Sequence, residues 1–480
     1  MFIDECCNAC CARNRTIAEQ MASGGTLNDL IERQAEKLAA NRRAAVPLQD
    51  PRDFSSLCAA HAQSRLGGRA GEEVREALSY GALQTADHHG GLYSPMSFQG
   101  DLLFGFFLRR LGYRGNVIPI LSFSIVRLGN ASFARGLMCY DRAEGITRVP
   151  LFKSPEENML VAFAPAFGDA ALARAERAAR REVRDEASRE LLLQILREDY
   201  ASGEVRACTR YADQITVLGA RLSRRVFPGD GWPVLLFLEC EELTRQLLMR
   251  DLENPDSLFF RMLSEPAIVE AMNRAELRPG RSVSSFLFLG SDRKGRAVVL
   301  NLCSDHMLRG RSLDGEDAVF SAEPESLKRH LENRALVPNG YLAALSLAWA
   351  RGLSWFGGEF QAIYLPAWQK TTAELLRGSG FPELAEAVEP WDCSGYLSSP
   401  VFAISPVEEG AAGAGPVEFL KYPPTAERLS AWLDTSLPDA HRMSMFELYH
   451  DLVPAGERKE WSYERIAREA ALRFPDNLLA

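Results

Sequence analysis

The spacing of apolar and polar residues along the chain changes between a strand pattern and a helix pattern. Residues 116–123 and 233–239 are rich in branched side chains and apolar on both faces, which is typical of central strands in a buried parallel sheet. Residues 99–112, just before the first of these strands, repeat apolar positions at helical spacing. Strands that alternate with helices predict an α/β fold built on a parallel sheet.

Longer helical and β-rich segments surround this predicted sheet. The composition of 13–45 is helical, and Thr26 or Asn28 could cap a helix there. The composition of 169–202 predicts the longest helix, spanning about 50 Å. Two strand-like runs within 285–302 flank a turn at Lys294-Gly295 and predict a β-hairpin, and 307–320 continues the β-rich portion. We expect the helical residues 169–202 and the β-rich residues 285–320 to be inserted into the core.

The chain, with 480 residues, is too long for a single hydrophobic core. The patterns divide it into a helical N-terminal segment over 1–80, an α/β core over 81–380 and a mixed α/β portion over 381–480. No internal repeat occurs at a fixed spacing.

The charge balance is acidic, because 55 basic and 64 acidic residues give 55 − 64 = −9. This net charge offers no global basic field, so we expect no nucleic-acid partner. No stretch reaches the roughly 20 apolar residues of a membrane helix, and the N-terminus lacks the pattern of a secretory signal. The expectation is a cytoplasmic protein without membrane association.

Four of the ten cysteines lie together near the N-terminus, at Cys6, Cys7, Cys10 and Cys11. This cluster supplies enough thiolates for a zinc or soft-metal site, but the second ligand pair of usual structural zinc sites is missing. The alternative is a flexible, reduced N-terminal tail. The other six cysteines are scattered and mostly lie in apolar contexts.

The stretch TADHHGGLYSP, residues 85–95, is the leading candidate site. It lies between helical residues and the apolar helix, in a loop where α/β proteins often bind ligands. Imidazoles can transfer protons near neutral pH, and glycines let a ligand approach the backbone closely. The candidate catalytic residues are Asp87, His88 and His89. The candidate cofactor-binding residues are Gly90, Gly91, Tyr93 and Ser94.

A second distinctive stretch, residues 336–369, contains VPNGYLAAL followed by GGEFQAIY. A glycine pair followed by an acid and a tyrosine suggests backbone contact with a ligand that a carboxylate orients. The alternative is a tight turn between a helix and a strand. The candidate substrate-binding residues are Asn339, Gly357, Gly358, Glu359 and Tyr364.

The strand predicted at 233–239 ends in an acidic run, Glu239, Glu241 and Glu242. Carboxylates at the end of a central strand suit metal, ribose or amine binding. The same acids also suit the polar start of the following helix, because acids favour helix N-termini. Both interpretations stay open. The pair Asp305-His306, beside the hairpin, is interpreted as a turn.

The two distinctive stretches together resemble the bacillithiol synthase family, which are cysteine-adding ligases. TADHHGGLYSP is similar to the family's TGQQxGLxxGPLY motif, and both lead into an apolar helix and a strand. VPNGYLAAL and GGEFQAIY are similar to its SPNVxLRP and GGPGExxY motifs. The hairpin, the helix at 323–333 and these motifs follow in the same order, over residues 80–370.

The resemblance implies a Rossmann-like core related to class I aminoacyl-tRNA synthetases, nucleotide binding, and a bond formed between an amino acid and a small amine. His88 and His89 take the places of the family's paired glutamines. Residues 124–133 replace the family's acidic, histidine-bearing strand end. No heptads run through 380–480, so a homodimer, if formed, lacks the family's long coiled coil.

Three functions follow from these patterns. The first is an amide-forming ligase of small-molecule biosynthesis that uses ATP or ADP, with His88 and His89 on an anionic group and Glu359 on the substrate ammonium. The second is a metal-dependent hydrolase or oxygenase that uses the Asp87-His88-His89 loop. The third is a non-enzymatic partner protein of a biosynthetic pathway. P-loop, G-x-G-x-x-G, H-E-x-x-H and G-x-S-x-G motifs are absent.

Overall fold

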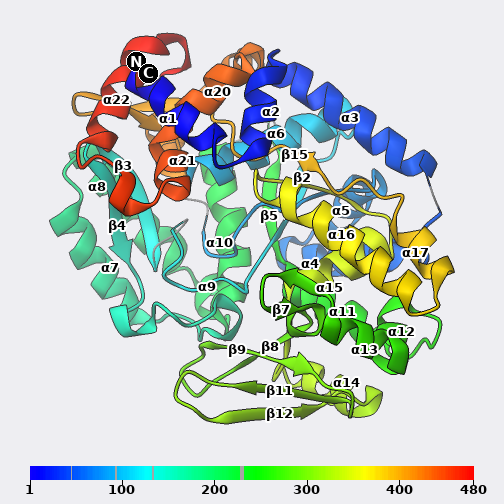
Figure 1. The fold of residues 1–480 in the computed structure, drawn as a ribbon. Helices are drawn as coiled ribbons and strands as arrows, with labels where there is room; N and C mark the ends of the chain where they lie inside the picture. The colour runs from blue at the N-terminus through cyan, green and yellow to red at the C-terminus, as the bar shows by residue number, and fades with distance from the viewer. Residues whose placement is uncertain (45, 92–93, 132–134, 228–231, 480) are drawn as a thin grey trace.

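A five-stranded parallel sheet forms the centre of the fold in the computed structural model, which describes residues 1–44, 46–91, 94–131, 135–227 and 232–479 (Figure 1). Every neighbouring pair of its strands is parallel. In spatial order the strands are β15 (Gly395–Tyr396), β14 (Ser354–Gly357), β1 (Ala82–Gln84), β2 (Val117–Ser122) and β5 (Val234–Glu239). The prediction of an α/β fold on a parallel sheet is confirmed.

Burial on both faces explains why β2 and β5 are apolar throughout. All six residues of β2 are buried, and β5 is buried after its first residue. The two strands pair in register from Val117 opposite Val234 to Ser122 opposite Glu239. Helices cover parallel sheets on both faces, so their strands lack the apolar–polar alternation of half-exposed strands.

The order of the strands reverses beside β1. The chain runs from β1 to β2 and β5 on one side, then returns to add β14 and β15 on the other side. In open α/β sheets such a reversal leaves a crevice at the carboxyl ends of the strands. The loops after β1 and β14 meet at this crevice.

The predicted helical composition of 13–45 is confirmed, and the segment consists of two helices, α2 (Arg15–Ser23) and α3 (Leu27–Ala44), the second beginning directly after the predicted cap residue Thr26. Gly24 and Gly25 separate the two helices with φ angles of 63° and 78°. This left-handed conformation is readily adopted by glycine and ends the helix.

The prediction of one long helix over 169–202 is wrong, because the segment is divided into shorter helices. It is divided into α7 (Asp169–Glu182) and α8 (Glu186–Ile195), followed by a π-helical turn at Leu196–Tyr200. Val183 is extended and buried between the helices, and the Asp185 side chain caps α8. Burial of Val183 and the new cap stabilise a break that the helix-favouring composition does not reveal.

The N-terminal and C-terminal segments lie side by side, and Figure 1 shows α1 (Phe2–Cys11) next to α22 (Ser462–Arg473). The Glu469 carboxylate accepts hydrogen bonds from the N–H groups of Phe2 and Ile3, at 3.0 and 2.9 Å. A carboxylate at a helix N-terminus satisfies donors that have no partner within the helix. The interpretation of the first residues as a flexible tail is therefore wrong.

The predicted hairpin is confirmed, with β8 (Phe288–Ser291) antiparallel to β9 (Ala297–Val299). A separate three-stranded sheet follows, formed by β10 (Asn301–Leu302), β11 (Met307–Arg311) and β12 (Asp317–Ser321). These strands lie at the lower edge of Figure 1, away from the helices of the two termini.

The other regular elements connect or cover these parts. The remaining helices are α4 (Arg52–Leu66), α5 (Ala70–Ser79), α6 (Pro95–Arg110), α9 (Gly203–Arg206), α10 (Tyr211–Val226), α11 (Cys240–Asp251), α12 (Leu258–Ser264), α13 (Pro266–Arg274), α14 (Pro324–Glu332), α15 (Gly340–Ala343), α16 (Gln361–Gly378), α17 (Pro382–Val388), α18 (Pro416–Lys421), α19 (Ala426–Ala431), α20 (Leu437–Met443) and α21 (Met445–Leu452). The remaining strands are β3 (Gly136–Arg142), β4 (Gly145–Pro150), β6 (Glu276–Arg278), β7 (Arg281–Ser282), β13 (Val337–Pro338), β16 (Ile404–Val407) and β17 (Gly410–Gly413).

Candidate functional site

A cavity of about 780 Å³ lies where the loops after β1 and β14 meet. Its size is within the range of small-molecule sites, and its position at the reversal of strand order is where open α/β sheets bind ligands. Residues from both distinctive stretches line it: His88, Ser94, Asn339, Gly358, Glu359 and Tyr364. The fold thus brings together two segments about 270 residues apart in the sequence.

His88 lies at the wall of this cavity. Its Nδ1 atom is 3.1 Å from the side-chain oxygen of Asn130, and its backbone forms a parallel bridge with Phe123. Burial lowers the pKa of His88 below its ordinary value of 6.5, so the ring is neutral at neutral pH. When Nδ1 donates to Asn130, Nε2 is the basic nitrogen of the ring.

His89 has a different environment, although it is the next residue. Its side chain is fully buried, with Nε2 2.8 Å from the carbonyl oxygen of Ala212 and Nδ1 2.6 Å from the Ser122 hydroxyl. A carbonyl can only accept, so Nε2 donates and Nδ1 accepts the serine proton. Burial lowers the pKa of His89 as well. The structure places His89 in the packing beneath the loop and outside the cavity lining.

Asp87 is buried beneath the loop and forms a hydrogen-bonded carboxyl pair with Asp101 of α6. Burial raises the pKa of Asp87 to about 6, and burial together with the charge of Asp87 raises that of Asp101 much further. Two carboxyls that share one site retain a proton between them. The Gln84 side chain also donates to Asp101, at 3.2 Å. The pair lies beneath the loop and does not line the cavity.

The remaining residues of the first stretch divide between backbone and cavity positions. Gly91 has a φ of 132°, a conformation that suits glycine, and the Gly90 carbonyl accepts from the Tyr211 hydroxyl at 3.1 Å. Neither glycine lines the cavity, whereas Ser94 does. Tyr93 lies outside the described residues.

Gln361 connects the two stretches and was not among the predicted site residues. Its amide donates to the Thr85 carbonyl at 2.9 Å and accepts from the Thr85 hydroxyl at 2.8 Å. A Cβ atom on Gly357 would lie 1.5 Å from the Gln361 side-chain oxygen. Glycine is therefore required at Gly357 so that Gln361 can reach the loop after β1.

Glu359 follows β14 directly and accepts a hydrogen bond from the Ser399 hydroxyl. Burial raises the pKa of Glu359 above its ordinary value of 4.5. Tyr364, one turn into α16, packs its ring against Trp368 with centroids 4.5 Å apart. Asn339 caps α15 by accepting from the Gly340 N–H at 2.7 Å. The second stretch therefore supplies a carboxyl group and an aromatic wall to the cavity.

The C-terminal portion contributes residues that the sequence interpretation missed. Glu447, His450 and Asp451 of α21 line the cavity, as do Arg458 and Tyr463 beyond it. The His450 ring is stacked on Tyr463, with centroids 3.5 Å apart and ring planes 4° apart. The spacing of 447, 450 and 451 places three polar side chains on one helical face, which was the available signal.

Glu447 is a buried carboxyl at the boundary between the cavity and the first stretch. It accepts hydrogen bonds from the Tyr140 and Ser94 hydroxyls and from the Met96 N–H. Burial and the nearby charge of Asp451 together raise the pKa of Glu447 to about 8. The cavity thus has an acidic end, formed by Glu359, Glu447 and Asp451.

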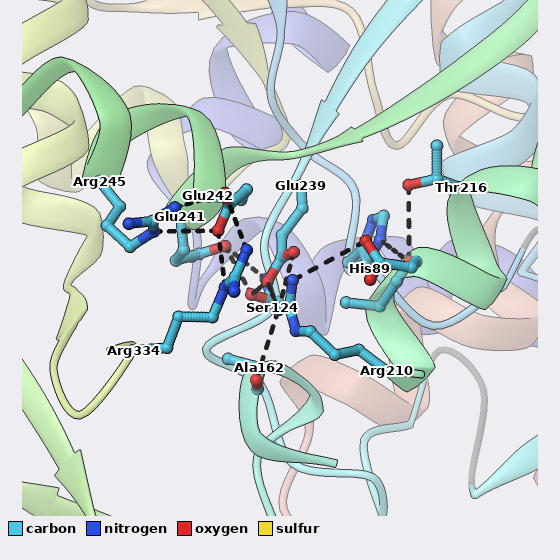
Figure 2. Close-up of polar contacts among 12 residues, drawn as sticks. His89, Ser124, Ala162, Arg210, Thr216, Glu239, Glu241, Glu242, Arg245 and Arg334 are labelled. Carbon is cyan, nitrogen blue, oxygen red and sulfur yellow. Dashed lines mark hydrogen bonds and ion pairs between the residues drawn. The ribbon is translucent and has the colours of Figure 1, made fainter. Parts of the chain in front are cut away.

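The acidic run after β5 is buried in a hydrogen-bonded network instead of lining the cavity (Figure 2). Glu239 accepts from Arg210 at 2.9 and 3.0 Å, and Glu242 pairs with Arg245 and Arg334. Glu241 accepts from the Ser124 N–H at 2.7 Å. The acids also lie at the start of α11, in agreement with the interpretation that they form the polar beginning of a helix.

The N-terminal cysteines lie on α1, and Cys6, Cys7 and Cys10 are buried. Burial raises the pKa of Cys7 and of Cys10 to about 12, so these thiols are protonated near neutral pH. Across the described ranges, no three His, Cys, Asp or Glu side chains are grouped in a way that could hold a metal ion.

The described residues define an α/β protein with a parallel sheet and a polar cavity at the carboxyl ends of its strands. Comparisons with protein-family models, curated proteins and solved structures gave no match for this chain. In the part of the chain that the structure describes, no helix combines the length and the apolar character needed to cross a membrane.

Proposed function

We propose that this chain is an amide-forming ligase that joins an amino acid to a small amine-bearing acceptor, with ATP as the nucleotide. The observation that carries the proposal is that His88 and Glu359, from loops after neighbouring parallel strands, line one cavity. With its strands numbered along the chain, the sheet has the order 3-2-1-4-5, and we interpret it as a Rossmann-like core.

The side chains of the cavity suit the two reacting groups. A half-buried carboxylate such as Glu359 stabilises a substrate ammonium by a charge-assisted hydrogen bond. The neutral ring of His88 has a basic nitrogen that accepts the proton which the attacking amine loses. The new C–N bond forms as the activated carboxyl loses its leaving group with the bonding electron pair.

Isothermal titration of the full chain with ATP and with a panel of amino acids tests this function, followed by mass analysis of products formed with candidate amines. We expect binding of ATP and of at least one amino acid. The Glu359→Gln variant should weaken amino-acid binding by tenfold or more, and the His88→Asn variant should slow product formation.

Glu408→Gln is a matched control, because Glu408 is exposed and does not line the cavity. It should behave like the unmodified chain. A folded protein that binds neither nucleotides nor amino acids would contradict the proposal.

A further inference from the structure

Two arginines face each other across a short hairpin at the cavity wall. Strands β6 and β7 pair antiparallel with Arg278 opposite Arg281, and Gly280 between them has a φ of 71°. Both arginines line the cavity. Like charges directly opposite each other in a β-ladder destabilise it, so this arrangement favours an anion near both.

Both guanidinium groups lie over the same aromatic ring. The Cζ atoms of Arg278 and Arg281 are 5.9 and 4.6 Å from the ring centroid of Phe286. Arg281 also donates to the hydroxyl and the carbonyl of Ser285, at 3.4 and 3.3 Å. Packing on a ring and bonds to neutral oxygens orient the side chains while their charges stay uncompensated.

Neither arginine forms an ion pair with a carboxylate among the described residues. By contrast Arg274, four residues before Arg278, is paired with Glu270 on the outer surface of α13. A planar guanidinium presents parallel N–H groups that match the oxygens of a carboxylate or phosphate. The hairpin therefore offers two guanidinium groups to a ligand in the cavity.

An aromatic wall connects the hairpin with the second sequence stretch. The Phe286 ring is 5.8 Å from Trp368, which packs at 4.5 Å against Tyr364. The charge of Arg278 also acts on the Tyr364 hydroxyl. The wall provides an aromatic surface beside the arginine pair, while carboxyls form the acidic end of the same cavity.

We propose that Arg278 and Arg281 bind the anionic group of the ligand that occupies this cavity, a phosphate or a carboxylate, with Phe286 as the platform beneath both side chains. The inference rests on the proposed function in one respect, which is that the anionic group belongs to the nucleotide or is the carboxylate of the amino acid. Binding of the anion itself involves no chemical step.

Titration calorimetry on the full chain tests the arginine pair, with pyrophosphate and succinate as probes at constant ionic strength. We expect one probe to bind, and to lose roughly tenfold or more in affinity in Arg278→Gln and in Arg281→Gln. Arg278→Lys and Arg281→Lys should retain part of the affinity, since they keep the charge and lose the planar fork.

Arg274→Gln is the matched control, because it removes the same charge from the same region outside the cavity. It should change the affinity by less than about twofold, since surface charges act weakly at a distance. Thermal melting curves report whether each variant is folded. Arg278 is exposed, so its glutamine variant is expected to fold.

The outcomes test the anion site independently of the proposed ligase function. Arginine-dependent binding of pyrophosphate assigns the site to phosphate, and that of succinate assigns it to a carboxylate, with or without ligase activity. Failure of both probes to bind the folded chain overturns the inference. So does binding that both glutamine variants leave unchanged, even when the ligase reaction is found.

Discussion

Ser399 donates a hydrogen bond to Glu359 across the ends of two neighbouring parallel strands. Strands β14 and β15 pair with Gly357 opposite Tyr396, so both residues follow their strands at the same edge of the sheet. Ser399 is 3% exposed and has a φ of 107°, a conformation that residues with a Cβ rarely adopt. The backbone is therefore strained where the hydroxyl reaches the carboxyl of the cavity.

This strain predicts that Ser399→Gly is more stable than Ser399→Ala. Both variants lose the hydrogen bond to Glu359, but only glycine relieves the positive φ. The free energy of unfolding from urea titration should favour the glycine variant by about 1 kcal/mol. Equal stabilities of the two variants would show that the backbone at this position is not strained.

The adjacent histidines should respond differently to substitution. His89→Ala removes a fully buried ring and its hydrogen bonds to the Ser122 hydroxyl and the Ala212 carbonyl, at a cost of about 1–3 kcal/mol. His88→Ala removes a ring at the cavity wall and should reduce stability less.

Urea unfolding measures the stabilities of both variants, and titration with ATP measures the effect of His88→Ala on ligand binding. A stability loss in His88→Ala that equals or exceeds the loss in His89→Ala would contradict the assignment of the two side chains.

The central strands could be predicted because their environment leaves a local signature. Burial on both faces of β2 and β5 requires continuous apolar runs, which the sequence displays. The hairpin of β8 and β9 could also be predicted from local sequence, since its turn residues lie between the two strands. The break at Val183 was not visible, because it depends on how that side chain is buried.

The site could be predicted only in part, because its contacts join distant segments. No local feature of the sequence distinguishes His88 from His89. The hydrogen bonds that hold His89 away from the cavity come from Ser122 and Ala212, which are 33 and 123 residues away in the sequence. The polar side chains of α21 were missed, although their helical spacing offered a signal. Their position at the cavity depends on the tertiary packing.

The buried cysteines of α1 should react slowly with thiol reagents. The thiolate is the nucleophile, and burial keeps Cys7 and Cys10 protonated at pH 8. Cys303 is partly exposed. Native alkylation followed by peptide mass analysis should label Cys303 roughly 100-fold or more faster than Cys7 or Cys10. In guanidinium chloride all should react alike, and similar rates in the native protein would contradict the burial of α1.

Glu241 holds a proton at neutral pH, because burial and the nearby charge of Glu239 oppose its ionisation. The Ser124 hydroxyl lies 2.8 Å from Glu239 and 2.9 Å from Glu241, yet it has only one proton to donate. The hydrogen bond that Glu241 accepts from the Ser124 N–H favours the ionised carboxylate, but burial outweighs it. Burial raises the pKa of Glu241 from 4.5 to about 8.

This proton makes the stability of the chain depend on pH in a defined direction. The folded state holds the Glu241 proton more tightly than the unfolded state. This carboxyl therefore lowers the free energy of unfolding, and the penalty grows as the pH rises from 4.5 to about 8. Glu241→Gln removes the penalty. Its advantage in unfolding free energy over the unmodified chain should rise across this window, by an amount on the order of a few kcal/mol.

Glu242→Gln is the matched control, because Glu242 is the next residue and its pKa is lowered, whereas that of Glu241 is raised. Although burial opposes ionisation, the hydrogen bond and charge of Arg245 lower the pKa of Glu242 to about 2. The stability that this carboxylate contributes is complete above pH 4.5 and is lost only as the pH falls toward 2. Urea titrations between pH 5 and 8 should therefore give a constant loss for Glu242→Gln and a rising gain for Glu241→Gln. A pH-independent difference for Glu241→Gln would show that Glu241 is already ionised throughout this range.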